Sequence, residues 1–139
     1  MGAWDYGTLD NDDAQDFVGD LLDSRGDRWR MIEAALDLIA NAAAEATEMP
    51  EEAAALAACE IVAAAASGAA VDELDEEVAA WAMRTAPKHL HILSKRAIFV
   101  VNRVSERSEL QQEWEHSGDY QSWLGELDDL KRRLAIAIH

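Results

Sequence analysis

Apolar residues recur along this chain at intervals of three and four positions, the spacing that places them on one face of a helix. Three stretches with this spacing, each bounded by a capping residue or a glycine, cover about residues 11–25, 28–46 and 119–134. A fourth stretch, from Pro50 to Gly68, is almost entirely small and apolar. Because a helix without a polar face is usually buried on several sides, we expect this one at the centre of the fold.

The region before the last stretch continues the helical pattern. An acidic run, residues 72–77, opens a segment that Pro87 interrupts. Helical spacing then resumes and reaches Trp114. If this long segment is interrupted before Trp114, the sequence places the break at Ser105 or Ser108.

Two segments depart from a plain helical pattern. Residues 97–101 are rich in β-branched side chains and would suit a strand, but no partner strand is visible elsewhere, so we expect a helix there. In residues 1–9, Trp4, Tyr6 and Leu9 have the alternating spacing of an extended arm. With no internal repeat and no flexible linker, the sequence predicts a single all-α domain, 1–139, built as a compact bundle of about five to six helices with an extended N-terminal arm.

The charge balance narrows the classes of partner. The chain has 28 acidic residues against 12 Lys plus Arg, a formal net charge of -16. A negative charge of this size repels nucleic acids and anionic membranes and attracts basic proteins. The acidic composition would also be explained if its role were only to keep the protein soluble. No apolar run approaches the ~18 residues of a membrane span. We therefore expect no binding of nucleic acid or membrane, and a basic protein as partner.

The cysteine content bears on the compartment. Cys59 is the single cysteine, so it forms no internal disulfide, which fits a reducing environment. The first residues show neither a basic leader nor an apolar signal segment. We expect a cytoplasmic location. Inside the most apolar stretch, the thiol of Cys59 is expected to be a small buried hydrophobe with a raised pKa rather than a nucleophile.

Two clusters have the residue types of a metal or acid–base site. The segment from Asp10 to Asp16 is rich in oxygens, but it lacks the glycine and glutamate of a calcium loop, and helix capping explains its first residues. Glu113 and His116 have the Glu-x-x-His spacing of di-iron bundles, but a second such pair is missing. We therefore expect no cofactor, no catalytic residue and no metal site, with Glu113 and His116 as the weak candidates for metal binding.

The charges are unevenly distributed along the sequence. Six bases lie between Arg84 and Arg107 against the single acid Glu106, whereas the first 27 residues hold eight aspartates and one arginine. An anion-binding patch is one interpretation of the basic segment. We favour internal pairing of this segment with the acidic run, residues 72–77.

Three segments carry a resemblance to a known family. They are the opening MGAWDYGTLDNDDAQDFVGDLLD, the central ALAACEIVAAAASG and the later SELQQEWEHSGDYQSWLGELDDLKRRL. Together they resemble the small bacterial proteins described as domain of unknown function 4259 (DUF4259). Asp5 and Tyr6 depart from the resemblance, since a small turn residue is expected after Trp4. The resemblance spans nearly the whole chain and implies no chemistry, cofactor or catalytic residue.

The leading hypothesis is a non-enzymatic protein-binding module, similar in kind to the immunity or antitoxin proteins that cover a basic toxin active site. Its binding carboxylates are expected first among Asp72, Glu73, Asp75, Glu76 and Glu77, and second among Asp13, Asp16 and Asp20. A less favoured alternative is an enzyme, metal-dependent or based on a carboxylate and a histidine, that uses Glu113 and His116. The other alternative is a structural subunit whose tryptophan-bearing helices form a homodimer.

Overall fold

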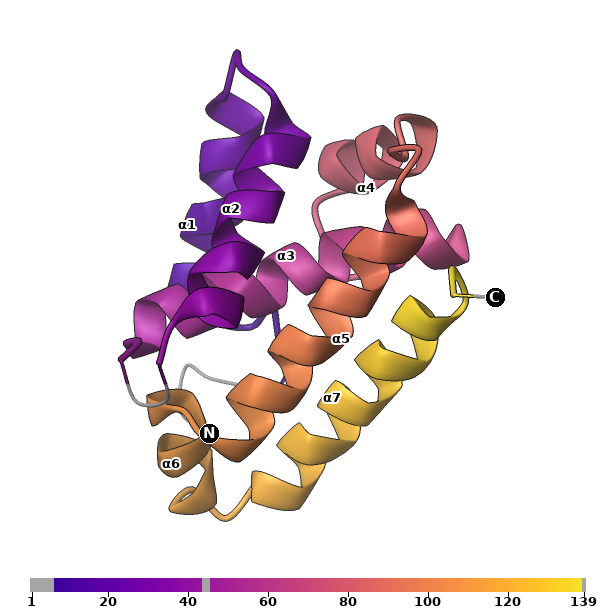
Figure 1. Ribbon diagram of the computed structural model, residues 1–139. Helices are drawn as coiled ribbons and strands as arrows, with labels where there is room; N and C mark the ends of the chain where they lie inside the picture. The colour runs from indigo at the N-terminus through magenta and orange to yellow at the C-terminus, as the bar shows by residue number, and fades with distance from the viewer. Residues whose placement is uncertain (1–6, 44–45, 139) are drawn as a thin grey trace.

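The computed structural model describes residues 7–43 and 46–138 of the 139-residue chain. Within these residues the fold is all-helical and has no strand (Figure 1). Its seven helices are α1 (Asp12–Asp23), α2 (Arg28–Asn41), α3 (Met49–Ser67), α4 (Glu76–Arg84), α5 (Leu90–Glu106), α6 (Glu109–Glu115) and α7 (Tyr120–Ala135). The β-branched segment 97–101 is helical, as expected. The predicted extended arm falls largely on residues 1–6, which lie outside the described residues.

Capping residues explain where α1 begins and where α3 begins and ends. Asn11 caps α1 by accepting a hydrogen bond from the backbone N–H of Ala14 at 2.8 Å. A capping box formed by Glu48 and Glu51 starts α3. The same helix ends at Gly68, whose φ of 74° lies in the left-handed region that glycine adopts without strain.

The described residues form seven helices rather than five or six because the stretch that reaches Trp114 divides in two. α5 ends at Glu106, and Ser108 caps α6 by accepting the backbone N–H of Gln111 at 2.9 Å. The same hydroxyl donates to the carbonyl of Val104 in α5 at 2.6 Å. The break therefore lies at one of the two serines that the sequence indicated.

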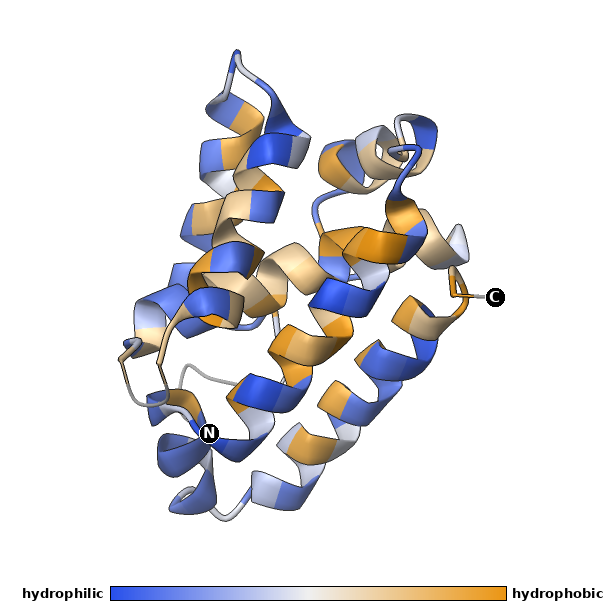
Figure 2. Ribbon diagram, in the orientation of Figure 1, coloured by the Kyte–Doolittle hydropathy of each residue, from blue (hydrophilic) through white to orange (hydrophobic). Residues whose placement is uncertain are grey.

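The central position predicted for α3 is confirmed. This helix contacts each of the other six, and its residues from Glu52 to Ala64 are buried apart from Ala54. Its alanine side chains let the neighbouring helices approach closely. In Figure 2, apolar and hydrophilic residues alternate along α5 and α7, as expected of helices with one buried stripe. No helix in the described part of the chain combines the length and the apolar character needed to cross a membrane.

Candidate functional site

A buried carboxylate, Glu60 of α3, joins three parts of the chain. Its side chain is only 4% exposed. Arg133 of α7 donates from Nη1 to Oε1 at 2.7 Å and from Nη2 to Oε2 at 3.3 Å. Thr8, in the segment before α1, donates its hydroxyl to Oε2 at 2.5 Å. The buried charge of Glu60 is thus both paired and hydrogen-bonded, which offsets the loss of its hydration.

The guanidinium of Arg133 is shared between two carboxylates. Its Nε donates to Oδ2 of Asp129 at 2.9 Å, one turn earlier in α7. Burial by itself would lower the pKa of Arg133, but hydrogen bonds and charge attraction from Glu60 and then from Asp129 outweigh this effect, so the pKa is raised. The positive charge of Arg133 is therefore compensated by two carboxylates of the protein itself.

An acidic cleft of about 280 Å³ opens beside this network. Its described lining residues are Gly7, Thr8, Leu9, Asp10, Glu60, Val71, Glu73 and Glu126. The pKa of Glu126 is raised first by burial and then by the negative charge of Asp129 and Glu60. Arg133 lowers this pKa, and Glu73 raises it further. Since no lysine or arginine is among the described lining residues, the acidic cleft favours a positively charged group.

The first group of predicted binding carboxylates contributes one residue, Glu73, to the lining of this cleft. All five of its acids are exposed: Asp72, Glu73, Asp75, Glu76 and Glu77. Glu73 lines the acidic cleft itself. Asp75 has a structural role, because its Oδ1 caps α4 by accepting the N–H groups of Glu77 at 2.9 Å and Val78 at 3.1 Å. The remaining four carboxylates are available on the surface.

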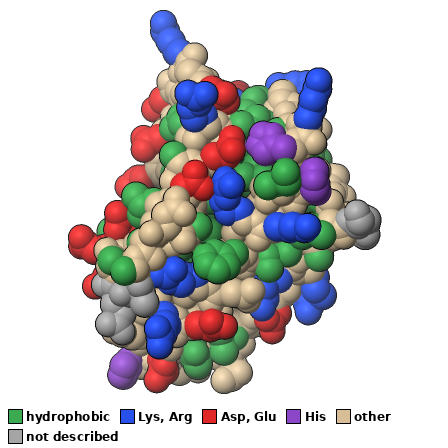
Figure 3. All heavy atoms as spheres, viewed as in Figure 1, with side chains coloured by type: hydrophobic (Ala, Val, Ile, Leu, Met, Phe, Trp, Pro, Cys, Tyr) green, Lys and Arg blue, Asp and Glu red, His purple; other side chains and the backbone are tan. Residues whose placement is uncertain are grey.

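The second group lies on α1, which contacts α4. Asp16 and Asp20 are exposed and four residues apart, so they share one face of α1. Asp13 is half-buried in the first turn, where its charge stabilises the helix N-terminus. In Figure 3 acidic side chains gather along the side formed by α1 and α2, whereas basic ones lie over α5 and α7 and at the upper ends of α1, α2 and α4.

A second and more apolar pocket, of about 480 Å³, is lined by residues of α3, α6 and α7; we call it the aromatic pocket. Its described lining residues are Gly7, Thr8, Asn11, Met49, Leu56, Leu110, Glu113, Trp114, His116, Ser117, Asp119 and Trp123. The rings of Trp114 and Trp123 stack with centroids 6.1 Å apart and planes 12° apart. Tyr120 also stacks on Trp123, at 6.2 Å and 26°.

The weak metal candidates Glu113 and His116 both line the aromatic pocket. Both are exposed, and Nδ1 of His116 lies 2.7 Å from the carbonyl oxygen of Gln112. Within residues 7–43 and 46–138, no three His, Cys, Asp or Glu side chains are grouped so that they could hold a metal ion. The structure thus places the pair at one pocket without adding further ligands to it.

Two other tryptophans serve as anchors between helices. Trp29 of α2 stacks on Trp81 of α4 with centroids 4.9 Å apart. The indole Nε1 of Trp29 donates to the carbonyl and the hydroxyl of Thr85, at 3.1 and 3.0 Å. The N–H of this large side chain therefore has partners inside the protein, as a buried indole requires.

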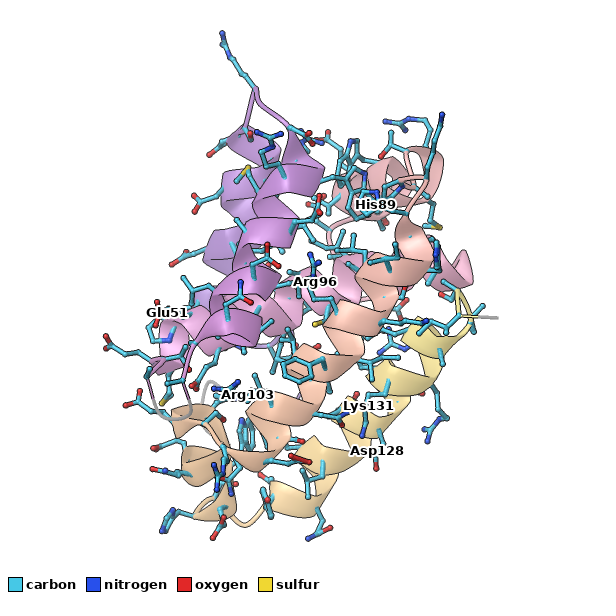
Figure 4. All side chains as sticks on the ribbon, viewed as in Figure 1. Glu51, His89, Arg96, Arg103, Asp128 and Lys131 are labelled. Atoms are coloured by element: carbon cyan, nitrogen blue, oxygen red, sulfur yellow. The ribbon has the colours of Figure 1, made fainter. Side chains whose placement is uncertain are left out.

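The basic segment pairs with α2, and the expected pairing with residues 72–77 is wrong for the described residues. Arg96 of α5 forms an ion pair with Asp37 at 3.1 Å, and Arg103 donates to the carbonyl of Ala42 just after α2. Both arginines are labelled in Figure 4, with Arg96 between α2 and α5. The reason is packing, since α5 lies against α2.

The interpretation of Cys59 as a buried structural thiol is confirmed. The side chain is fully buried, and its Sγ lies 3.6 Å from the carbonyl oxygen of Ala97 as a donor. Burial raises the pKa of Cys59 well above its ordinary value, and the negative charge of Glu60 raises it further. A thiol in this state is a poor nucleophile.

Comparison with known families identifies the chain. The family model described as domain of unknown function (DUF4259) matches residues 2–126. The chain belongs to the DUF4259 family. The match includes every described lining residue of the acidic cleft and of the aromatic pocket in this DUF4259 protein, while Arg133 lies beyond it. Neither the curated proteins nor the solved structures gave a match.

The network around Glu60 in this DUF4259 protein was not predicted from the sequence. A signal was present, because Glu60 is a charged residue within an otherwise apolar helix, and a buried charge needs a partner. The sequence contains no comparable indication of which residue pairs with Glu60. Lys131, Arg132 and Arg133 stand side by side in the sequence, and their order alone does not show which one faces α3.

Proposed function

We propose that this DUF4259 protein is a non-enzymatic binding module for a basic protein and that the acidic cleft receives a lysine or arginine side chain of that partner. The observation that carries the proposal is the crowding of carboxylates in the cleft. Glu126, with its raised pKa, ionises against the charges of Asp129, Glu60 and Glu73. A cation that enters the cleft relieves this repulsion and stabilises the ionised form.

The surface around the cleft supports the same interaction. Glu73 lines the cleft, its sequence neighbours Asp72, Glu76 and Glu77 are also exposed, and the whole chain carries a formal net charge of -16. A field of this sign speeds the approach of a basic protein. The arrangement suits an inhibitor of the immunity or antitoxin kind, which covers a basic active site with carboxylates.

The cleft is organised before any partner arrives. Arg133 and Thr8 hold the carboxylate of Glu60 in place through three hydrogen bonds. A side chain that is already ordered loses little conformational entropy on binding. We also propose a cytoplasmic location, which the single, buried Cys59 supports because a reducing compartment keeps such a thiol free.

Charge reversal in the acidic run that contributes Glu73 to the cleft tests this proposal. The bait variant carries Asp72→Lys, Glu73→Lys and Glu76→Lys, and it keeps Asp75 because that residue caps α4. Proteins retained from an extract of the source cells are identified by mass spectrometry, and the retained protein is then purified for calorimetric titration. We expect a basic protein whose affinity falls at least about tenfold, since reversed charges at an interface both remove attraction and add repulsion.

A matched control separates the site from the total charge. Glu106→Lys, Glu115→Lys and Asp128→Lys make the same change in net charge at exposed positions outside the cleft lining. The control variant is expected to bind within about threefold of the wild type when salt screens distant charges. Equal loss of binding in both variants, or undiminished binding by the cleft variant, would contradict the proposal.

A further inference from the structure

The aromatic pocket has the size and the walls of a small-molecule site. Its volume of about 480 Å³ lies within the range of roughly 300–1,000 Å³ that is usual for ligand pockets. Leu56 of α3, Leu110 of α6 and Trp123 of α7 contribute apolar side chains that are themselves buried. These fixed side chains offer an apolar surface to the body of a ligand.

Stacked rings form part of the wall. Trp114 is half-buried, and it stacks nearly parallel to the buried Trp123. An indole face attracts flat apolar groups, and it also attracts cations, because its π-system carries a negative potential. The wall is therefore suited to a ligand that has both an apolar body and a positive charge.

Carboxylates supply the charge that selects this ligand. Glu113 and Asp119 line the pocket and are exposed, and neither forms an ion pair with a described residue. The described lining contains no lysine or arginine that would compensate them. The polar groups therefore disfavour an anion such as a fatty acid and favour a cation.

We infer that the aromatic pocket binds a small organic cation, an amine or quaternary ammonium ion attached to an aromatic or aliphatic body. The body packs on Trp114 and Trp123, and the positive nitrogen lies toward Glu113 and Asp119. This site differs from the acidic cleft, with which it shares only Gly7 and Thr8 among the described lining residues. The inference therefore stands independently of the proposed partner protein.

Three probes of similar size and different charge test the inference on the full chain. They are 2-phenylethylammonium, 2-phenylethanol and phenylacetate, titrated at about 0.15 M salt, which screens distant charges, and at about pH 8, above the usual range of histidine titration. Indole N–H signals in ¹H–¹⁵N NMR spectra follow binding, and the Trp114 signal is assigned by its absence in Trp114→Phe. We expect the ammonium probe to bind about fivefold more tightly than the alcohol, with the Trp114 signal shifted and the carboxylate probe weakest.

Paired variants locate the origin of the selectivity. Glu113→Gln with Asp119→Asn should reduce the preference for the ammonium probe to less than about twofold while the alcohol binds as before. The matched control, Glu115→Gln with Asp128→Asn, removes two exposed charges outside the pocket lining and should leave the preference unchanged. Trp114→Leu should weaken all three probes. If that variant does not fold, the pair at Glu113 and Asp119, both exposed, still decides the question.

Several results would overturn the inference. One is equal affinity for the ammonium and alcohol probes. A second is no binding of any probe up to about 10 mM, the weak end of measurable affinities. A third is binding that shifts other signals but not the Trp114 signal. Loss of selectivity in the Glu115 and Asp128 control would show that the selectivity comes from the net charge of the protein. That result would also refute binding of the cation by the carboxylates of the pocket. The acidic-cleft variant with Asp72, Glu73 and Glu76 reversed should bind the ammonium probe normally, which keeps this test separate from that of the proposed function.

Discussion

Removing the guanidinium of Arg133 tests the account of the buried network directly. Arg133→Met retains much of the aliphatic stem but deletes the donors to Glu60 and Asp129. The carboxylate of Glu60 then stays buried, with the hydroxyl of Thr8 as the one donor left from the network. The variant therefore exposes the cost of a buried charge that has lost its cation.

The size of the effect follows from burial. Removing one partner of a buried ion pair costs about 3–5 kcal/mol of folding free energy. The side chain of Glu60 is 4% exposed and that of Arg133 is 18% exposed, so some water reaches the pair and Thr8 continues to donate. We therefore expect the lower end of the range, about 3 kcal/mol. This is a large part of the ~5–15 kcal/mol by which domains of this kind are stable.

Urea unfolding followed by far-UV circular dichroism measures the change. The control is Arg132→Met, the same substitution one position earlier in α7. The Arg132 side chain is 72% exposed and pairs with Asp129 at 3.5 Å, an interaction whose removal should cost less than about 0.5 kcal/mol. Adding Glu60→Gln to Arg133→Met should recover about 1–2 kcal/mol, because the uncompensated charge disappears.

Two outcomes would refute this reasoning. Equal stability of the Arg133→Met and Arg132→Met proteins would show that the guanidinium of Arg133 contributes no more than a surface charge. A double variant less stable than Arg133→Met alone would show that the carboxylate of Glu60 is not the source of the cost. Either result would also remove the support for a fixed Glu60 in the lining of the acidic cleft.

Two further predictions concern the other acids of α3 and α7. The pKa of Glu126 is raised above its ordinary value of 4.5, so ionisation of this side chain opposes folding. The contribution of the protonated Glu126 to the folding free energy is complete below pH 4.5, and it is lost as the pH rises through the folded-state pKa. Glu126→Gln should therefore stabilise the protein at neutral pH, by less than about 1 kcal/mol because the group is partly exposed, and this gain should vanish in acid. Thermal unfolding at several pH values measures the gain. A gain that does not depend on pH would contradict the raised pKa of Glu126. Glu52 is fully buried and accepts from the N–H of Leu110 at 2.9 Å and the hydroxyl of Thr47 at 2.7 Å. Glu52→Ala should cost about 2–3 kcal/mol by urea unfolding and speed amide exchange in α6, whereas unchanged protection there would count against this role.

Local pattern explains why most of the helices were predictable. Apolar spacing, capping residues and the alanine-rich composition of α3 all act within a few residues of the chain, so they can be read from it. The end of α2 could not be read in this way, because nothing in the alanine-rich sequence stops the helix at Asn41. The backbone is extended at Ala42, and its carbonyl accepts a hydrogen bond from Arg103 of α5. Only the folded protein brings those residues together.

The same limit applies to the candidate site. Glu73 was predicted from the acidic run, and its exposure agrees with that expectation. The pairing of Glu60 with Arg133 joins positions that are 73 residues apart, and the pairing of Arg96 with Asp37 depends on α5 lying against α2. A run of charges shows that partners are needed. It does not show which helix supplies them.

The position of Glu60 also has a consequence for how the chain folds. One side chain in the middle of the sequence is bonded to Thr8, 52 residues earlier, and to Arg133, 73 residues later. Each of these two long loops loses conformational entropy when it closes at the Glu60 carboxylate. The hydrogen bonds do not offset this loss until the helices within the loops have formed. The beginning and the end of the domain are thereby coupled, so loosening of either one removes a bond that orients the carboxylate for the other. Unfolding is expected to involve both ends at once rather than to start as separate fraying of each.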